Sequence, residues 1–504
     1  MPTLDAIQPP SQHMYQNYHE TPRPRKRRIW PWVVLLLILL GGGAWFGTLV
    51  LSKANQIFTN KENIFTRLTK LILSPNKPLI GEQEGQINML LMGVGGEGHD
   101  GAYLTDTMIL AQINTKNNEA VLTSIPRDFA VNLPGLGFNK INAAYAFHAD
   151  PVEAAEAALA SAEQVTGFDI PYYAVIDFQG FVAAVNDVGG LDVTVDQTFT
   201  DSTFPNDYPY DTKGYLAPVT FTKGDQHLDG VRALMFARSR HSPDAEEGSD
   251  FARSERQKKI LVAMKEKILA LNLTDLKTIN NLLSDFTENF TTNLEPFELK
   301  RLSELTKNIA SDKIYSFAME PQSNIICSAL VDPKTGERVP PPPEPDPEET
   351  LDTIPGETTT TAGTDDTDET GTEAEPEIIR MYVIRPCEGK ELSDVHKFLK
   401  NSAVLAKLKK EGAVVEIQNS TGKVAAETPW KKLLNVNIDA RFAIFRGKVA
   451  YDQTILYDNS QGSSPNTLDY LNSNYVFTTS DVSYPDSAAD FVIVIGKDTL
   501  WKSL

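Results

Sequence analysis

The chain has 504 residues, of which 41% are hydrophobic and 23% charged, a composition typical of folded domains rather than of a wholly disordered protein. Its net charge of −20 argues against a protein that coats nucleic-acid phosphates nonspecifically, so we expect no nucleic-acid partner. Two cysteines and seven scattered histidines argue against a disulfide scaffold and against a zinc enzyme.

An uncharged apolar segment follows a basic cluster near the amino terminus. Residues 23–28 carry five basic side chains, and residues 29–51 contain no charge, which is enough helix to cross a bilayer. Because basic flanks stay on the cytoplasmic side, we predict a cytoplasmic tail over 1–28, a single transmembrane helix over 29–51 and an extracytoplasmic remainder that begins with a juxtamembrane segment over 52–84. A cleaved signal peptide is the alternative, for which this apolar run is long.

Strands and helices then alternate over residues 85–335, the pattern of an α/β domain with a single core. Strands are expected over 87–93, 107–113, 120–125, 172–177 and 191–195. The Ala-rich segment 140–165 is predicted to be helical, with an interruption where Asp150 caps a new helix and Pro151 begins it. A long helix is expected over 251–270.

An acidic segment, rich in Pro and Thr, follows over residues 336–377. Its part from Glu344 to Glu377 holds 13 acidic residues and no basic one, and without it the rest of the chain has a net charge of −7. The segment has too few apolar side chains to offset the entropy lost on ordering it. We therefore expect a disordered linker.

The linker is followed by an apolar strand expected over 378–384 and by Cys387. This order suggests that the linker is inserted into a hairpin whose arms a disulfide between Cys327 and Cys387 joins, so that residues 378–408 would complete the first domain. Two unrelated thiols are the alternative. Residues 412–504, with strands expected over 413–418, 453–457 and 491–495, predict a second, smaller α/β domain.

Arginines are concentrated between residues 236 and 257, in the segments FARSRH and DFARSERQ. The apolar stripe of the second segment's helix comprises Ile260, Leu261, Met264, Ile268 and Leu269. Counting back by four places Gln257 and Arg253 on the same inward face, with Arg256 close to it. A buried guanidinium needs an anion, and a helix amino terminus favours phosphate, so the pattern predicts a phosphate or diphosphate site. Salt bridges to Asp225, Asp229 or Asp250 are the alternative.

Two further segments have the chemistry to join this anion site. Arg127 and Asp128 follow an apolar strand in the segment SIPRD, at the end where sheets open their ligand sites. The Gly-rich loop 93–101 precedes Asp106, whose carboxylate could hold a divalent ion between protein and diphosphate oxygens. A turn or strand-start hydrogen bond is the alternative role of Asp106.

These segments resemble the LytR-CpsA-Psr family of membrane-anchored cell-envelope enzymes. The resemblance covers about residues 87–331 and extends to 378–408, through LLMG, LTDT, SIPRD, KINAAYA, GGLDV, LDGVRALMFARSRH and DFARSERQ. Residues 412–504, with VVEIQNSTG and ADFVIVIGKD, resemble the accessory LytR C-terminal domain.

The resemblance implies an α-β-α layered domain with a mixed central sheet, a hydrophobic tunnel for a polyprenyl chain, and transfer of a glycopolymer from a polyprenyl diphosphate carrier to peptidoglycan at the cell membrane. It also implies which residues act. Diphosphate ligands would be Arg127, Arg238, Arg240, Arg253, Arg256 and Gln257. Asp106 would help to hold Mg²⁺, and polyprenyl phosphate would leave with its charge stabilised by Arg238 and Arg240. Asp250 or Asp128 would deprotonate the acceptor hydroxyl.

This chain departs from the family pattern at two positions. It has Gly95 where the family commonly has an aspartate, and Leu104 where an arginine commonly precedes the LTDT-type aspartate. Asp100 and His99 lie in the same loop, and Asp100 is predicted to replace the missing metal ligand. Two alternatives to the transferase remain: a hydrolase that uses water as acceptor, and a non-enzymatic receptor for lipid-linked glycan.

Overall fold

A computed structural model describes residues 77–99, 101–206, 214–244, 247–270, 289–321, 325–339, 380–421, 433, 438–445, 447, 449–485 and 487–498. The predicted cytoplasmic tail, the predicted transmembrane helix and most of the juxtamembrane segment lie outside these residues. Within them, no helix combines the length and hydropathy needed to span a bilayer.

A six-stranded mixed sheet forms the centre of the larger domain, in the order β11-β6-β1-β2-β3-β12. Its strands are β1 (Gln86–Val94), β2 (Thr105–Asn114), β3 (Glu119–Ser124), β6 (Tyr172–Asp177), β11 (Phe290–Thr292) and β12 (Ile314–Ala318). β1 pairs in parallel with β6 and β3 with β12, whereas β2 is antiparallel to both of its neighbours. The mixed central sheet predicted from the family resemblance is confirmed.

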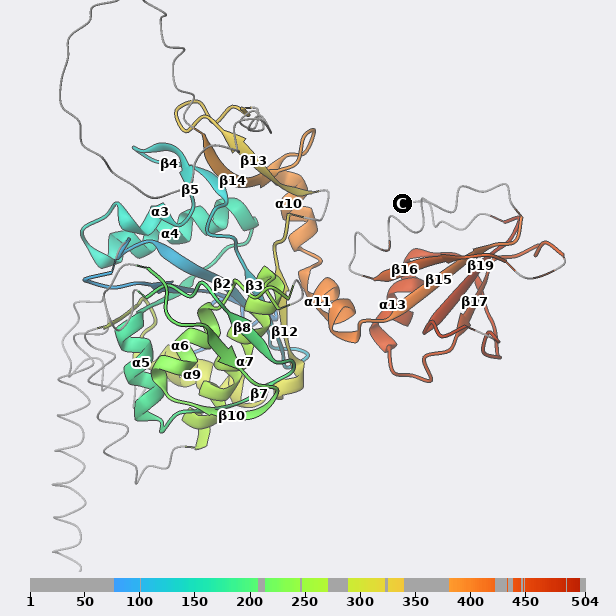
Figure 1. The fold of residues 1–504 in the computed structure, drawn as a ribbon, viewed down its shortest axis with the longest axis horizontal. Coiled ribbons are helices and arrows are strands. Elements are labelled where there is room, and N and C mark those ends of the chain that lie inside the picture. Colours follow the sequence, from blue (N-terminus) through green and yellow to red (C-terminus); the bar gives the residue numbers. More distant parts are fainter. Residues whose placement is uncertain are drawn as a thin grey trace, which may run out of the picture. The chain divides into compact units, whose positions relative to one another are not determined.

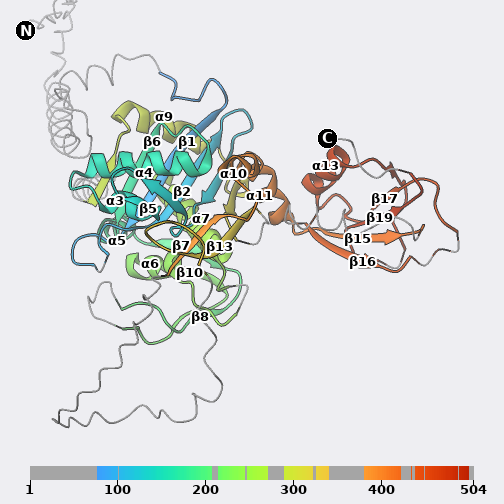
Figure 2. The same ribbon diagram turned by 90° about the horizontal axis from the view of Figure 1, so that it is seen from above.

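Helices cover both faces of this sheet (Figure 1). Successive residues of a strand point to opposite faces, and these strands are apolar on both faces, so each face packs against helices. Leu90, Met92 and Leu110 face α4 (Pro151–Thr166), and Met89, Ile109 and Ala111 face the opposite side. That second side is covered by α7 (Asp250–Ala270) and α9 (Pro296–Lys307). Figure 2 shows α4 lying over the strands.

The remaining elements of this domain are short. They are β4 (Ala130–Leu133), β5 (Gly137–Lys140), α3 (Ala143–Ala146), α5 (Phe178–Asp187), β7 (Leu191–Val195), β8 (Phe199–Asp201), β9 (Val219–Phe221), β10 (Gly224–Leu228), α6 (Gly230–Arg238) and a 3-10 turn at Ser311–Lys313. α6 packs against α5 and α7. Three two-stranded sheets pair β4 with β5, β7 with β10 and β8 with β9.

The predicted strands of this domain are confirmed, and so is the helix start at Asp150, whose carboxylate accepts from the amides of Val152 and Glu153. One prediction was partly wrong. Residues 137–140 form β5, and only a single helical turn, α3, precedes Asp150, because Lys140 and Asn139 pair with β4 instead of continuing a helix.

The hairpin predicted around the acidic linker is present. β13 (Ile326–Val331) pairs antiparallel with β14 (Met381–Pro386), and a disulfide joins Cys327 to Cys387. The helices that follow, α10 (Leu392–Leu399) and α11 (Ser402–Glu411), contribute Val395, Leu399 and Leu405 to the core against α4 and the sheet. Residues 381–406 therefore complete the core of the larger domain.

The boundary predicted for the linker was too early. Residues 336–339 belong to the hairpin, because the Gly336 amide donates to the Asp332 carbonyl and the Val339 amide donates to the Leu330 carbonyl. The rest of the predicted linker lies outside the described residues.

The smaller unit has a five-stranded sheet in the order β16-β15-β19-β17-β18. Its elements are β15 (Val414–Asn419), β16 (Asp439–Ala443), β17 (Ile455–Asp458), α13 (Pro465–Asn474), β18 (Thr478–Thr479) and β19 (Phe491–Ile495). Its core contains Val415, Ile417, Leu456, Leu471 and Ile493. A second α/β unit was predicted here; its likeness to the LytR C-terminal domain stays a prediction.

Candidate functional site

Several of the polar residues predicted to form the anion site lie at one edge of the central sheet. β1, β3, β6 and β12 all run in the same direction, so their carboxyl ends meet at this edge, where sheets commonly open ligand sites. Asp177 ends β6, Arg127 follows β3, and Glu320 follows β12. The antiparallel strand β2 begins at the same edge and places Asp106 there.

Arg127 and Asp106, predicted as a diphosphate ligand and a metal ligand, lie in contact. The Arg127 guanidinium donates to Asp106 Oδ1 at 2.7 Å, with about a third of each side chain exposed. Burial opposes the charge of Arg127, but the carboxylates of Asp106, Asp128 and Asp250 outweigh it and raise the Arg127 pKa above its ordinary value. Arg127 thus stays a cation with one edge open to a ligand.

Arg253 lies on the inward face of α7, as the helical spacing predicted, and is only 7% exposed. Burial and the neighbouring cations Arg240 and Arg127 lower its pKa to about 10, although Asp250 opposes this shift. Its Nη2 lies 3.2 Å from Asp250 Oδ1, whereas its Nε is buried without a hydrogen-bond partner in the described structure. A buried guanidinium with an unused donor is a site for an anion.

Gln257 lies one turn further along the same face. Its amide nitrogen is 3.5 Å from Thr107 Oγ1 on β2 and 3.5 Å from the Ala237 carbonyl on α6, so it spans the two elements. Its Oε1 is buried and accepts no hydrogen bond from the residues described. The structure therefore brings Gln257 and Arg253 to the edge that carries Arg127 and Asp106.

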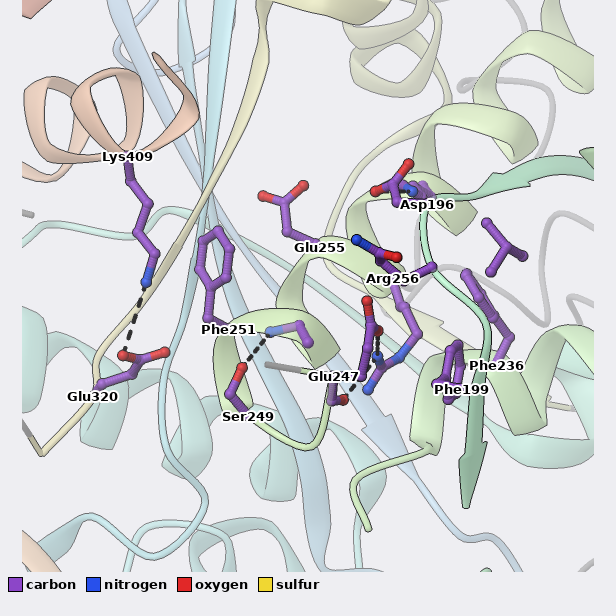
Figure 3. A pocket seen from close by; sticks show the side chains of 14 residues that line it. Asp196, Phe199, Phe236, Glu247, Ser249, Phe251, Glu255, Arg256, Glu320 and Lys409 are labelled. Carbon is purple, nitrogen blue, oxygen red and sulfur yellow. Dashed lines mark hydrogen bonds and ion pairs between the residues drawn. The ribbon is translucent and has the colours of Figure 1, made fainter. Parts of the chain in front are cut away.

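Arg256 is also buried, but both terminal nitrogens of its guanidinium are already occupied. It donates to Glu247 Oε2 at 3.0 Å and to the Ser239 carbonyl at 2.6 Å, and it stacks over the Phe199 ring at 4.7 Å (Figure 3). Arg256 therefore fastens the loop before α7 to the end of α6. For this residue the alternative of internal pairing holds, with Glu247 as the partner.

Salt bridges from the site arginines to Asp225, Asp229 or Asp250 were the alternative to an anion site, and of these three acids only Asp250 forms ion pairs with those arginines in the described structure. Asp225 accepts from the Thr194 hydroxyl, and Asp229 caps α6 by accepting from the Arg232 amide. Asp250 lies 3.2 Å from Arg253 Nη2 and 4.0 Å from Arg240 Nη2, with its side chain 41% exposed. One exposed carboxylate shared by two cations leaves positive charge for an anion.

Arg238 lies beside the Gly-rich loop. Its guanidinium carbon is 4.2 Å from the centre of the Phe178 ring and 5.4 Å from that of Phe204. Phe178 also meets the ring of His99 in that loop at 5.2 Å. Arg240 is held through its backbone, because the buried Asp201 carboxylate accepts from its amide at 3.0 Å.

Of the two candidates for the base, Asp128 has closer ion-pair partners than Asp250. Asp128 Oδ1 accepts from Lys140 Nζ at 2.6 Å, and its side chain is 18% exposed. It also lies 3.6 Å from Arg127 Nε. The Asp250 side chain is 41% exposed and has no lysine partner among the ion pairs of the described residues, so it is the better placed of the two to reach a substrate hydroxyl.

The carboxylates that could hold a metal are sparse. No group of three or more Asp, Glu, His or Cys side chains gathers as a metal site in the described part of the chain, and Asp100 lies outside it. Leu104 precedes Asp106 at the start of β2, and a Cβ atom on Gly95 would lie 2.5 Å from His99 Nδ1. The His99 ring therefore occupies the space that a side chain at position 95 would need.

Sequence reasoning missed several residues at this edge. Asp177 caps α5 through the Gly180 amide, and burial raises its pKa. Glu320 lies beside Phe251 in the first turn of α7, and its pKa is raised chiefly by burial. Asp177 is the last residue of β6, and Glu320 lies two residues after the end of β12. The reasoning that selected Arg127 could have selected Asp177, whereas the strand before Glu320 was not predicted.

Two related proteins are named as cell-wall transferases. A polyisoprenyl-teichoic acid–peptidoglycan teichoic acid transferase TagU of Oceanobacillus iheyensis is 29% identical over 290 residues, covering 56% of this chain and 83% of the relative. Its namesake in Enterococcus faecalis is 28% identical, covering 54% of this chain and 79% of the relative.

Solved structures are also similar to this chain. The Lin1025 protein of Listeria innocua is 22% identical with a TM-score of 0.40, over 63% of this chain and 98% of that one. TagV of B. subtilis is 24% identical with a TM-score of 0.39, over 63% and 97%. The model of the LytR_cpsA_psr family matches residues 49–333, more than half of the sequence. The chain therefore belongs to the LytR-CpsA-Psr family.

Proposed function

We propose that this chain is a transferase that moves a glycopolymer from a polyprenyl diphosphate carrier to peptidoglycan. Family membership and the activity named for the TagU relatives support the reaction. The observation that carries it is the unused Nε–H donor of the buried Arg253, next to the partly exposed Arg127 guanidinium at the ligand edge of the sheet. These donors suit a diphosphate better than a single carboxylate.

In the proposed reaction an acceptor sugar hydroxyl attacks the sugar-proximal phosphorus. The new O–P bond forms as the bond to the bridging oxygen breaks, polyprenyl phosphate leaves, and the hydroxyl proton passes to a carboxylate. Such a transfer needs positioning and charge stabilisation more than covalent catalysis. Arg127 and Arg253 would bind the diphosphate, and Arg238 and Arg240 would stabilise the leaving phosphate.

Asp250 is the proposed base. Its exposed carboxylate lies at the amino terminus of α7 beside Arg253, whereas Asp128 is paired with Lys140. A base must reach the hydroxyl of a substrate seated on the arginines, and Asp250 already contacts one of them.

Mg²⁺ is the proposed cofactor. Proteins commonly hold Mg²⁺ with one or two carboxylates together with substrate phosphates, so Asp106 fits this role even without a cluster of acids around it. Asp100 is the second proposed ligand. Bound there, Mg²⁺ would neutralise part of the diphosphate charge. To serve as a ligand, Asp106 must share its carboxylate between Arg127 and the metal.

We further propose that residues 29–51 anchor the protein in the cell membrane, with residues 1–28 in the cytoplasm and both folded units outside. The uncharged apolar run and its basic flank support this topology. A carrier lipid embedded in the same membrane would then lie within reach of the enzyme.

The test uses the full chain in liposomes with Mg²⁺, a radiolabelled polyprenyl diphosphate oligosaccharide and peptidoglycan. Arg238→Ala is compared with Arg232→Ala, a matched control on the same helix, because both guanidinium groups stack on a phenylalanine, at 4.2 and 4.1 Å. Label should pass to peptidoglycan, and Arg238→Ala should lower the rate by about a hundredfold. The control should keep more than a third of the rate.

The label also separates the alternatives. Release of free sugar phosphate in place of labelled peptidoglycan would show that the protein is a hydrolase and not a transferase. Tight binding of the donor substrate without any product would show that the protein is a receptor. A loss of less than threefold in Arg238→Ala would remove Arg238 from the site.

A further inference from the structure

A cavity of about 450 Å³ lies on the face of the first turns of α7 opposite to Asp250, Arg253 and Gln257. Its walls come from the end of β7, the start of β8 and the segment between them, from α6, the loop before α7, α7 itself and α11, and from Glu320 after β12. In Figure 3, Lys409 and Glu320 lie at one end, and Asp196, Arg256 and Phe199 lie at the other.

The lining chemistry excludes two of the groups that a carrier substrate brings. Four carboxylates line the cavity, those of Asp196, Glu247, Glu255 and Glu320. Three cations face them, namely Arg256, Lys259 and Lys409. Each of the three cations already faces a carboxylate, which leaves no cation over for a diphosphate, and seven charged side chains make a poor environment for a polyprenyl chain.

The charges are largely paired with one another. Lys259 Nζ lies 2.6 Å from Asp196, Arg256 lies 3.0 Å from Glu247, and Lys409 Nζ lies 4.0 Å from Glu320. A ligand therefore need not carry charge to be accommodated. Paired carboxylates and ammonium groups still accept from and donate to hydroxyls, which do both.

Some hydrogen-bonding capacity in the cavity is unused, and an apolar surface accompanies it. Glu320 Oε1 and Arg256 Nε are buried without hydrogen-bond partners in the described structure. The rings of Phe199, Phe236 and Phe251 also line the cavity, and Lys409 Nζ lies 3.7 Å from the centre of the Phe251 ring. Ring surfaces combined with a few polar groups suit a ligand that has both apolar faces and hydroxyls, as a sugar ring does.

The cavity and the anion site share one turn of helix. Ser249, Phe251 and Ala252 line the cavity, whereas Asp250 and Arg253 belong to the anion site. A sugar bound in the cavity would therefore lie across α7 from a diphosphate bound by Arg253, about 10 Å away, the diameter of one helix.

We propose that this cavity is a subsite for a neutral saccharide unit of one of the two glycan substrates. The proposal rests on the proposed function and adds to it the place where a sugar binds. The saccharide can belong to the acceptor glycan or to the donor, and both sources offer the same hydroxyl-bearing ring.

The test measures binding of an N-acetylglucosamine tetramer to the full chain by calorimetry. The test variant is Asp196→Ala with Lys259→Ala, and the control is Asp192→Ala with Lys267→Ala. Each double variant removes one exposed ion pair between the β7 region and α7, with the same 2.6 Å contact, but only the first pair lines the cavity. Binding should weaken about tenfold in the test variant and stay within twofold in the control.

Binding of geranyl diphosphate is measured in parallel, because it reports on the anion site alone. Unchanged diphosphate binding with weakened saccharide binding supports the subsite. Saccharide binding that is absent in the wild-type chain, or equal in the two double variants, overturns it. Loss of diphosphate binding in the wild-type chain would instead count against the proposed function.

Competition identifies the source of the sugar. Geranyl diphosphate linked to N-acetylglucosamine should displace the tetramer if the donor sugar occupies the cavity. If both bind together, the cavity receives the acceptor.

Discussion

Replacing Arg253 by methionine should abolish most activity without weakening the fold. The side chain is 7% exposed, and burial together with two neighbouring cations lowers its pKa to about 10, so the resting protein holds this charge at a cost. Exchange for an apolar side chain of similar length should leave the free energy of unfolding unchanged or slightly higher. Loss of one preorganised donor to the substrate should cost about 3–4 kcal/mol in the transition state, or at least a hundredfold in rate.

Arg256→Met provides the contrast three residues further along the same helix. Its guanidinium serves Glu247 and the Ser239 carbonyl, and the Glu247 side chain is only 18% exposed. Removing the cation leaves both acceptors underused, so the free energy of unfolding should fall by about 2–3 kcal/mol.

The assay pairs urea unfolding with the initial rate of label transfer for both variants. Arg253→Met should be a stable protein with little activity, and Arg256→Met should be a less stable one. The reasoning would be refuted if Arg253→Met kept a third of the wild-type rate. It would also fail if Arg253→Met lost more stability than Arg256→Met.

Three further measurements test the structure. Cys327→Ser with Cys387→Ser should lower the free energy of unfolding by about 2–4 kcal/mol, because the disulfide closes a loop of 60 residues; equal urea midpoints for variant and wild type would contradict this. The hydrogen bond from Arg301 lowers the pKa of Glu82, so this pair stabilises the fold above the ordinary Glu pKa and the contribution is lost as pH falls through the lowered value. Glu82→Gln should therefore lower the melting temperature at pH 7 and match the wild type in acid, and a constant difference at all pH values would argue otherwise. Gly95→Ala should destabilise the protein by about 1–3 kcal/mol, because the new Cβ would meet His99 Nδ1 at 2.5 Å, and His99→Ala should relieve the loss; an equal loss in both backgrounds would show that the ring is not the obstacle.

The sequence by itself determined the local elements and the direction of key side chains. Apolar runs bounded by turn residues located β1, β3, β6 and β19, because a strand buried on both faces has few polar positions. The Asp150-Pro151 pair located the start of α4 through the hydrogen bonds that its amino terminus requires. Helical spacing placed Arg253 and Gln257 on the buried face of α7.

Only the tertiary structure decided what those side chains face. Helical periodicity orients a residue toward the core but does not say which distant segment lies there. It could not distinguish Arg253, whose ion pair is with the exposed Asp250, from Arg256, whose terminal nitrogens are bound to Glu247 and Ser239. The same holds for Glu320, which β12 carries to the start of α7 through its pairing with β3, nearly 200 residues earlier in the chain. Strand order depends on contacts between residues far apart in sequence, and no local pattern encodes them.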